Sequence, residues 1–152
     1  MIKGRPPRLE EIFQRYNAPV FFVTICTLHR QRFSNLAKVK EAFEAYAVRA
    51  TDFNVAVGRY VLMPDHMHFF ICGDEEFKLA EWVKGLKRAI TSAFSKEQAR
   101  SLWQPGFFDH LLRNDESYGQ KWTYVCENPV RAGLVSKVED WPFQGEIIEI
   151  DR

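Results

Sequence analysis

Hydrophobic and polar positions recur along the chain with two different periods, which predict strands and helices in turn. Three segments rich in β-branched and aromatic residues are predicted as strands: 20–27, 54–63 and 66–72. Two segments carry apolar residues at helical spacing and are predicted as helices: 36–51 and 77–94. A short strand is predicted within 104–112. A last helix is predicted from Asp115, as its N-cap, to about Asn128, because Pro129 marks its end.

This order of elements predicts an α+β protein. Strand–helix–strand–strand–helix–strand is the order of the split βαβ, or ferredoxin-like, fold. It implies an antiparallel sheet with helices on one face, here followed by a C-terminal helix. Pro64-Asp65 has the residues of a tight turn, so the second and third strands are expected to form a hairpin. We expect an extended basic N-terminal arm, one compact domain and an acidic C-terminal tail: 1–18, 19–138 and 139–152.

The composition agrees with a single folded domain. A chain of 152 residues with 46% hydrophobic residues can bury one core, and it is not the composition of a disordered protein. The three cysteines are far apart in sequence, which is typical of reduced thiols in the cytoplasm. No apolar run approaches the roughly 20 residues that span a bilayer. We therefore expect a soluble, cytoplasmic protein with no membrane partner.

Charge changes this picture only locally. The net charge of +1 argues against a broadly basic nucleic-acid binder. Basic residues nevertheless gather in the N-terminal fifth and between 78 and 100, where they could contact phosphates, which need local rather than global charge. The alternative is that these residues form the solvated faces of helices, which is the commoner origin of such patches.

His66 and His68 are the first candidates for chemistry. On a strand they share one face, because side chains alternate with period 2. Two imidazoles on one face can both reach one cation. Such pairs more often occur as ordinary surface or hydrogen-bonded histidines. Here the pair opens a strand that continues into apolar residues, where histidines need partners.

Two tyrosines on the last predicted helix compete for the role of nucleophile. Tyr118 shares a helical face with apolar residues at offsets of four, seven and eleven, and is expected in the core. Tyr124 shares a face with polar residues, which favours it for attack on a phosphate. Asn128 lies one turn further on and can place an amide oxygen beside it. An ordinary surface tyrosine is the alternative interpretation of Tyr124.

Together these side chains could cleave a phosphodiester bond. A tyrosine supplies a covalent nucleophile, and a divalent cation polarises the phosphate oxygens. Two imidazoles and one amide oxygen, from His66, His68 and Asn128, form a mixed nitrogen and oxygen site with open positions. Such a site suits Mg²⁺ or Mn²⁺, although affinity order alone would favour Zn²⁺ or Cu²⁺.

Three motifs, in order, resemble those of the REP-associated tyrosine transposases, single-strand DNA transposases of the HUH superfamily with one catalytic tyrosine. The motifs are Met63-Pro64-Asp65-His66-Met67-His68-Phe69, then Trp103-Gln104 with Gly106-Phe107-Phe108-Asp109-His110, then Tyr124-Val125-Cys126-Glu127-Asn128-Pro129-Val130-Arg131-Ala132-Gly133-Leu134-Val135. The resemblance runs from about Arg5 to Val135 and implies an HUH-type catalytic domain.

The resemblance implies a role for each of these residues. His66 and His68 would be the metal ligands, and Tyr124 would form a 5′-phosphotyrosine link and leave a free 3′-OH. Asn128 stands where related insertion-sequence transposases carry a glutamine as third ligand. The substrate would be single-stranded hairpin DNA. Charge and placement give these candidate DNA contacts: Arg5, Arg8, Arg30, Arg32, Lys84, Lys87, Arg88, Lys121 and Arg131.

Two rival functions use the same residues. The chain could be a catalytically idle protein, derived from a transposase, that binds hairpin DNA or RNA without cutting it. It could also be a metal-dependent hydrolase that activates water at the histidines. The sequence does not choose between a monomer and a homodimer.

Overall fold

The computed structural model describes residues 19–112 and 117–150. The expected basic arm over 1–18, with Arg5 and Arg8, lies outside the described residues, as does Asp115. In chain order the elements are β1 (Phe21–Cys26), η1 (Leu28–Arg30), α2 (Leu36–Arg49), η2 (Ala50–Phe53), β2 (Val55–Met63), β3 (His66–Gly73), α3 (Leu79–Thr91), α4 (Lys96–Ala99), β4 (Phe108–Leu111), α5 (Tyr118–Val125), α6 (Asn128–Arg131), η3 (Val138–Asp140) and β5 (Gln144–Glu146).

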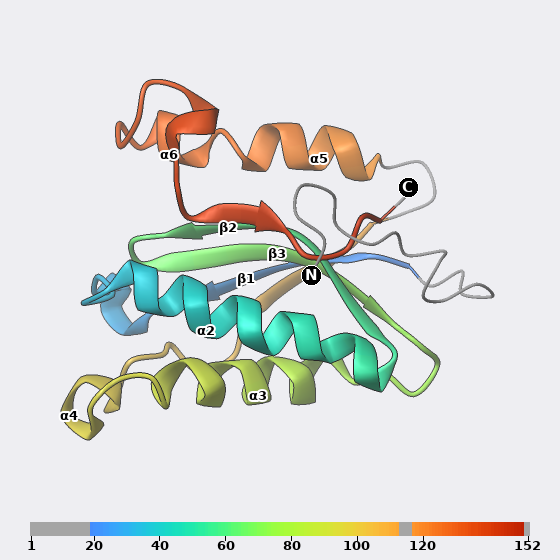
Figure 1. Ribbon diagram of the computed structural model, residues 1–152, viewed down its shortest axis with the longest axis horizontal. Coiled ribbons are helices and arrows are strands. Elements are labelled where there is room, and N and C mark those ends of the chain that lie inside the picture. The colour runs from blue at the N-terminus through green and yellow to red at the C-terminus, as the bar shows by residue number, and fades with distance from the viewer. Residues whose placement is uncertain (1–18, 113–116, 151–152) are drawn as a thin grey trace.

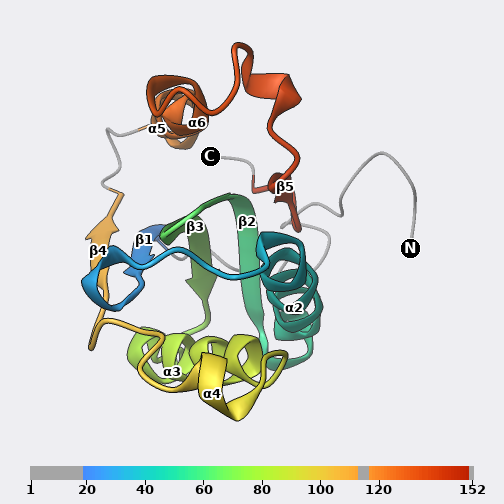
Figure 2. The same ribbon diagram turned by 90° about the vertical axis from the view of Figure 1, so that its left-hand side faces the viewer.

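Five strands form one sheet in the order β4-β1-β3-β2-β5, and the paired strands are antiparallel. The first four strands have the order expected of the ferredoxin-like fold, which confirms the predicted fold class. β2 and β3 form the predicted hairpin around Pro64-Asp65. The sheet lies in the middle of the molecule, with α2, α3 and α4 on one side and α5 and α6 on the other (Figures 1 and 2).

The face towards α2 and α3 holds the main core. Alternate residues of β3, Met67, Phe69 and Ile71, are completely buried there. They pack with Phe43 of α2 and Leu86 of α3 in one hydrophobic cluster. Both helices present an apolar stripe to this face, as the helical spacing of the sequence predicts.

The opposite face is covered by α5 and by the C-terminal segment. Tyr118 packs there with Phe70, while Val125 packs with Val61 of β2. The sequence did not indicate which face this helix would cover, and the structure places it opposite α2 and α3 (Figure 2).

The ends of the last helix differ from the predicted ones. Ser117 is its N-cap, since its side chain accepts a hydrogen bond from the Gln120 backbone N–H. The helix ends at Val125, three residues before Asn128, and Pro129 lies in the first turn of α6 rather than stopping α5.

The segment expected as an acidic tail belongs to the sheet in its described part. β5 pairs with β2, and Ile148 and Ile150 are buried beside Ala56 and Phe70. In the described ranges, no helix is long and apolar enough to cross a membrane.

Candidate active site

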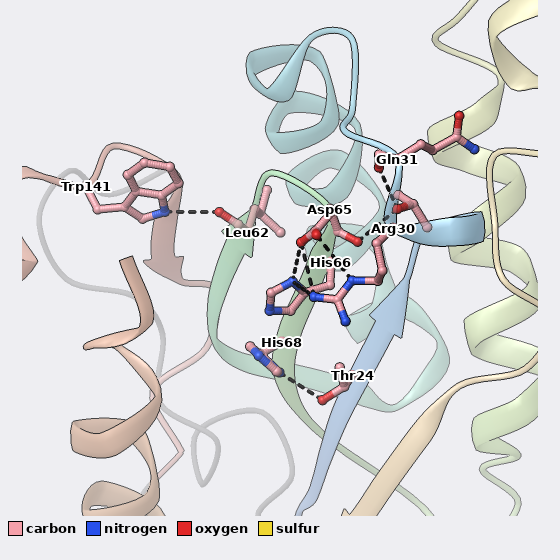
Figure 3. A network of polar contacts seen from close by, with 9 residues as sticks. Thr24, Arg30, Gln31, Leu62, Asp65, His66, His68 and Trp141 are labelled. Atoms are coloured by element: carbon pink, nitrogen blue, oxygen red, sulfur yellow. Dashed lines mark hydrogen bonds and ion pairs between the residues drawn. The ribbon is translucent and has the colours of Figure 1, made fainter. Parts of the chain in front are cut away.

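His66 and His68 lie on the face of the sheet that α5 covers. In the register, His68 stands between Thr24 of β1 and Val61 of β2. The two imidazole rings are 4.8 Å apart between centroids and nearly perpendicular. The predicted shared face is therefore found, at the end of the sheet next to the Pro64-Asp65 turn (Figure 3).

A carboxylate orients His66. The His66 Nδ1 lies 2.7 Å from Asp65 Oδ1. The Arg30 guanidinium holds that carboxylate, with Nε 3.2 Å from Oδ2 and Nη2 3.3 Å from Oδ1 (Figure 3). Arg30 Nη2 also lies 3.2 Å from Nδ1, but the carboxylate is the closer partner and the better acceptor. We therefore infer that His66 carries a proton on Nδ1 and donates it in a hydrogen bond to Asp65, which leaves the lone pair of the ring on Nε2.

A hydroxyl orients His68. Thr24 Oγ1 lies 2.8 Å from His68 Nδ1. The ring also stacks on Phe22, 5.2 Å away between centroids and 17° from parallel. Burial, and then the nearby His66, lower the pKa of His68 to about 3, so its imidazole is neutral at neutral pH. A neutral His68 that donates from Nδ1 presents Nε2 as its free ligand atom.

These two imidazoles fit a divalent cation. Each uses Nδ1 for an orienting contact, and metal-binding histidines usually engage their second ring nitrogen in such a hydrogen bond. Within residues 19–112 and 117–150, no third His, Cys, Asp or Glu joins them to form a group of metal-binding side chains. A cation held by His66 and His68 would therefore keep several positions for oxygen ligands.

The two tyrosines of α5 have different environments. Tyr118 is only 4% exposed, and its hydroxyl accepts a hydrogen bond from the Arg59 backbone N–H at 2.7 Å. A side chain at Gly58 would collide with that hydroxyl, so Gly58 makes room for it. Burial raises the pKa of Tyr118. Tyr118 is therefore a core residue, whereas Tyr124 is 64% exposed.

Packing brings the Tyr124 end of α5 to the histidines. Val125 shares a hydrophobic cluster with Val61 and Met63, and these are the cross-strand partners of His68 and His66. The indole Nε1 of Trp141, in the same cluster, donates to the Leu62 carbonyl at 3.0 Å (Figure 3). Tyr124 is the neighbour of Val125, so its backbone lies beside the histidine end of the sheet.

Arg131 contacts both Tyr124 and Asn128 at this end of α5. Its guanidinium lies 4.2 Å from the centroid of the Tyr124 ring. It donates to the Tyr124 carbonyl at 2.8 Å and to Asn128 Oδ1 at 2.6 Å. Lys121 lies one turn earlier, with Nζ 4.9 Å from the centroid of the Phe22 ring. Both charges help to lower the pKa of His68, so both lie within electrostatic range of it.

The remaining predicted DNA contacts are spread over the molecule. Lys84 and Arg88 are exposed on α3, on the far side of the sheet from the histidines, and Arg32 is exposed after η1. Lys87 donates to the Gln104 and Gly106 carbonyls at 3.0 and 2.7 Å, and burial lowers its pKa. Its ammonium therefore supports the turn before β4.

Sequence reasoning missed the partners that orient the pair. The structure adds a contact between His66 and Asp65, a residue of the predicted turn. The sequence analysis took Arg30 for a phosphate contact and did not consider Thr24 or Phe22. An alignment of β1 against β3 in antiparallel register would have found Thr24, because Thr24 stands directly opposite His68.

Two curated relatives of this chain are described as REP-associated tyrosine transposases. A REP-associated tyrosine transposase of Escherichia coli strain K12 is 34% identical over 90 residues, which cover 57% of this chain and 52% of that relative, about half its length. A Haemophilus influenzae chain that carries the same name provisionally is 25% identical over 136 residues, covering 82% of this chain and 77% of its own.

A solved structure supports the same fold. It is described as a REP-associated tyrosine transposase bound to a REP hairpin, and it superposes with a TM-score of 0.69 at 24% identity over 95% of this chain and 82% of that one. The expected resemblance is confirmed. The family model described as "Transposase IS200 like" matches residues 14–125, well over half of the 152 residues, so this chain belongs to that family.

Proposed function

We propose that this protein nicks and rejoins single-stranded hairpin DNA through a covalent bond to Tyr124. The observation that carries the proposal is that two oriented imidazoles lie near the end of α5 that bears an exposed tyrosine. Family membership and the hairpin-bound relative agree with this substrate class.

In the proposed reaction the Tyr124 phenol oxygen attacks the scissile phosphorus. A phosphorus–oxygen bond to Tyr124 forms as the bond to the 3′-oxygen breaks, so the 5′-phosphate stays on the protein. The phenol proton leaves to solvent, and the departing oxygen takes up a proton to become a 3′-OH. Rejoining is the reverse attack by a 3′-OH. The arrangement needs no external energy source, because one phosphodiester replaces another.

His66 and His68 would hold Mg²⁺ or Mn²⁺ through Nε2. Such an ion, when bound, supplies Lewis-acid stabilisation of charge on the phosphate oxygens. Asn128 Oδ1 is the proposed third ligand. Since it accepts a hydrogen bond from Arg131 at 2.6 Å, it would exchange that bond for the cation. The released guanidinium, together with Lys121, could then contact the phosphate.

The proposal is tested by incubating the protein with a labelled hairpin oligonucleotide and detecting a covalent protein–DNA adduct that resists denaturation. We expect the adduct with Mn²⁺ or Mg²⁺ and its loss in chelator. Tyr124→Phe should remove the adduct and keep hairpin binding, because only the nucleophilic oxygen is lost. Tyr118→Phe is the matched control on the same helix and should retain the adduct.

The same assay separates the rivals. Hairpin binding by the native chain without any metal-dependent cleavage would identify an idle binder. Cleavage that survives in Tyr124→Phe and leaves no adduct at any time would identify a hydrolase that uses water. Either result overturns the proposed tyrosine chemistry.

A further inference from the structure

Phe108 is an aromatic side chain at the edge of the sheet that the core does not use. It belongs to β4, which pairs with β1 alone and forms one border of the sheet. Its side chain is 60% exposed, whereas the preceding Phe107 packs against the main core. Isolated exposed aromatic residues are common, so the position of Phe108 matters more than its exposure.

The strand register puts Phe108 on the histidine face. Phe108 stands opposite Thr24, and Thr24 stands opposite His68. Directly opposed residues of antiparallel strands project to the same side of the sheet. Thr24 confirms this orientation, because its hydroxyl contacts the His68 ring. Neighbouring strands are about 4.8 Å apart, so the Phe108 backbone lies roughly 10 Å from that of His68.

The surface between them suits a single nucleic-acid strand. Phe22 also points to this face, since it stacks on His68. Lys121 of α5 places its ammonium over the Phe22 ring, 4.9 Å from the centroid. Proteins that hold single strands combine cations along the backbone with aromatic rings under the bases. Aromatic side chains and a positive charge thus continue from the histidines towards β4.

We propose that the Phe108 ring stacks on the base of a nucleotide that flanks the scissile phosphate. The inference rests on the proposed function, because it takes His66 and His68 to mark the position of that phosphate. At the rise of about 3.4 Å per nucleotide of stacked DNA, 10 Å corresponds to at most about three nucleotides, and to fewer in an extended strand. Stacking on one ring is tolerant of sequence, so Phe108 adds affinity and register rather than base identity.

Equilibrium binding in the uncleavable Tyr124→Phe background tests the stacking. The probe is a DNA hairpin with single-stranded flanks that carries 2-aminopurine at one flank position at a time. Phe108→Ala should raise Kd by about 5-fold to 150-fold, the range of one base–aromatic stack. Phe108→Trp should keep the affinity and quench the 2-aminopurine at one flank position. Leu111→Ala is the matched control, because Leu111 is 45% exposed on the same strand but stands opposite Phe21, on the other face.

A second measurement uses the same hairpin with an abasic nucleotide at the position where 2-aminopurine is quenched. The abasic site should weaken binding of the Phe108 protein to the level of Phe108→Ala, and should cost Phe108→Ala nothing further. Equal losses from the abasic site in both proteins, or equal affinities of Phe108→Ala and Leu111→Ala, would overturn the stacking. These readings need no cleavage, so they stay separate from the adduct assay: a missing adduct counts against the tyrosine chemistry, and an unaltered Kd counts against Phe108.

Discussion

The two faces of the sheet are built from alternate residues of the same strands, yet they differ in chemistry. On β3, Met67, Phe69 and Ile71 are completely buried under α2 and α3. The residues that point to the other face include His66 and His68, which remain partly exposed and are held by polar partners. One strand therefore gives the fold its core on one side and its candidate site on the other.

The difference teaches how a rigid site can be built from polar groups. His68 lies between the core residues Met67 and Phe69, and Met67 follows His66, so packing on the far face fixes the backbone at both histidines. The polar contacts then have only the ring orientation to fix. We expect substitutions on the α2/α3 face to change the free energy of unfolding, and those of the exposed polar residues on the α5 face to change metal and DNA binding.

The largest expected effect is that of Phe69→Ala, on the face of the sheet that α2 and α3 cover. Phe69 contacts the rings of Phe43 and Trp82, with centroids 5.6 Å away in both cases. Its removal should lower the free energy of unfolding by about 3–5 kcal/mol, measured by denaturant titration. Tyr124→Ala, which truncates an exposed ring, is the control and should cost under about 1 kcal/mol. Similar losses in both variants would break the comparison between the faces.

Alternation explains why much of the site could be predicted from the sequence. Period 2 placed His66 and His68 on one face, and helical spacing separated the buried Tyr118 from the exposed Tyr124. Both inferences use only local geometry, which tertiary contacts did not override here. The same local periodicities identified the strands and helices, and their order along the chain then predicted the ferredoxin-like fold.

The remaining features depend on contacts between distant residues. Arg30 reaches Asp65 because His29 and Arg30 both adopt left-handed backbone conformations, with φ of 54° and 56°. Neither residue is a glycine, so the sequence gives no sign of this turn, which costs about 1–2 kcal/mol per residue. β5 was missed because it is a strand of only three residues, Gln144–Glu146, and it pairs with a strand far away in sequence.

Asp65→Asn should have the next largest effect, and it tests whether the carboxylate of Asp65 orients the His66 ring. The substitution keeps the shape but removes the charge that holds His66 Nδ1–H and Arg30. We expect affinity for Mn²⁺ to fall about 10-fold to 100-fold in a titration with the purified protein. Glu75→Gln, an exposed site in the β3–α3 connection, is the charge-matched control. Unchanged affinity in Asp65→Asn would show that packing alone orients the ring.

The smallest expected effect concerns the neutrality of His68 and is measured in chelator, so that no metal interferes. Burial lowers the pKa of His68 to about 3, whereas an unfolded histidine titrates near 6.5. Below pH 6.5 the unfolded chain therefore takes up a proton that the folded chain refuses, so stability is complete above that pH and falls as the pH drops. Between pH 6.5 and 5 the loss from His68 should be roughly 1.5 kcal/mol.

His68→Gln separates this contribution from the others. Glutamine cannot be protonated, so the variant should show a shallower decrease in the free energy of unfolding over the same interval. The pKa of Asp65 is lowered from an already acidic value, so its own contribution is lost at lower pH and does not enter this window. His66 also has a lowered pKa and should supply the slope that the variant retains. Parallel profiles for the two proteins would mean that water reaches His68 freely, and the polar face would then be open where the structure shows a ring packed against Phe22.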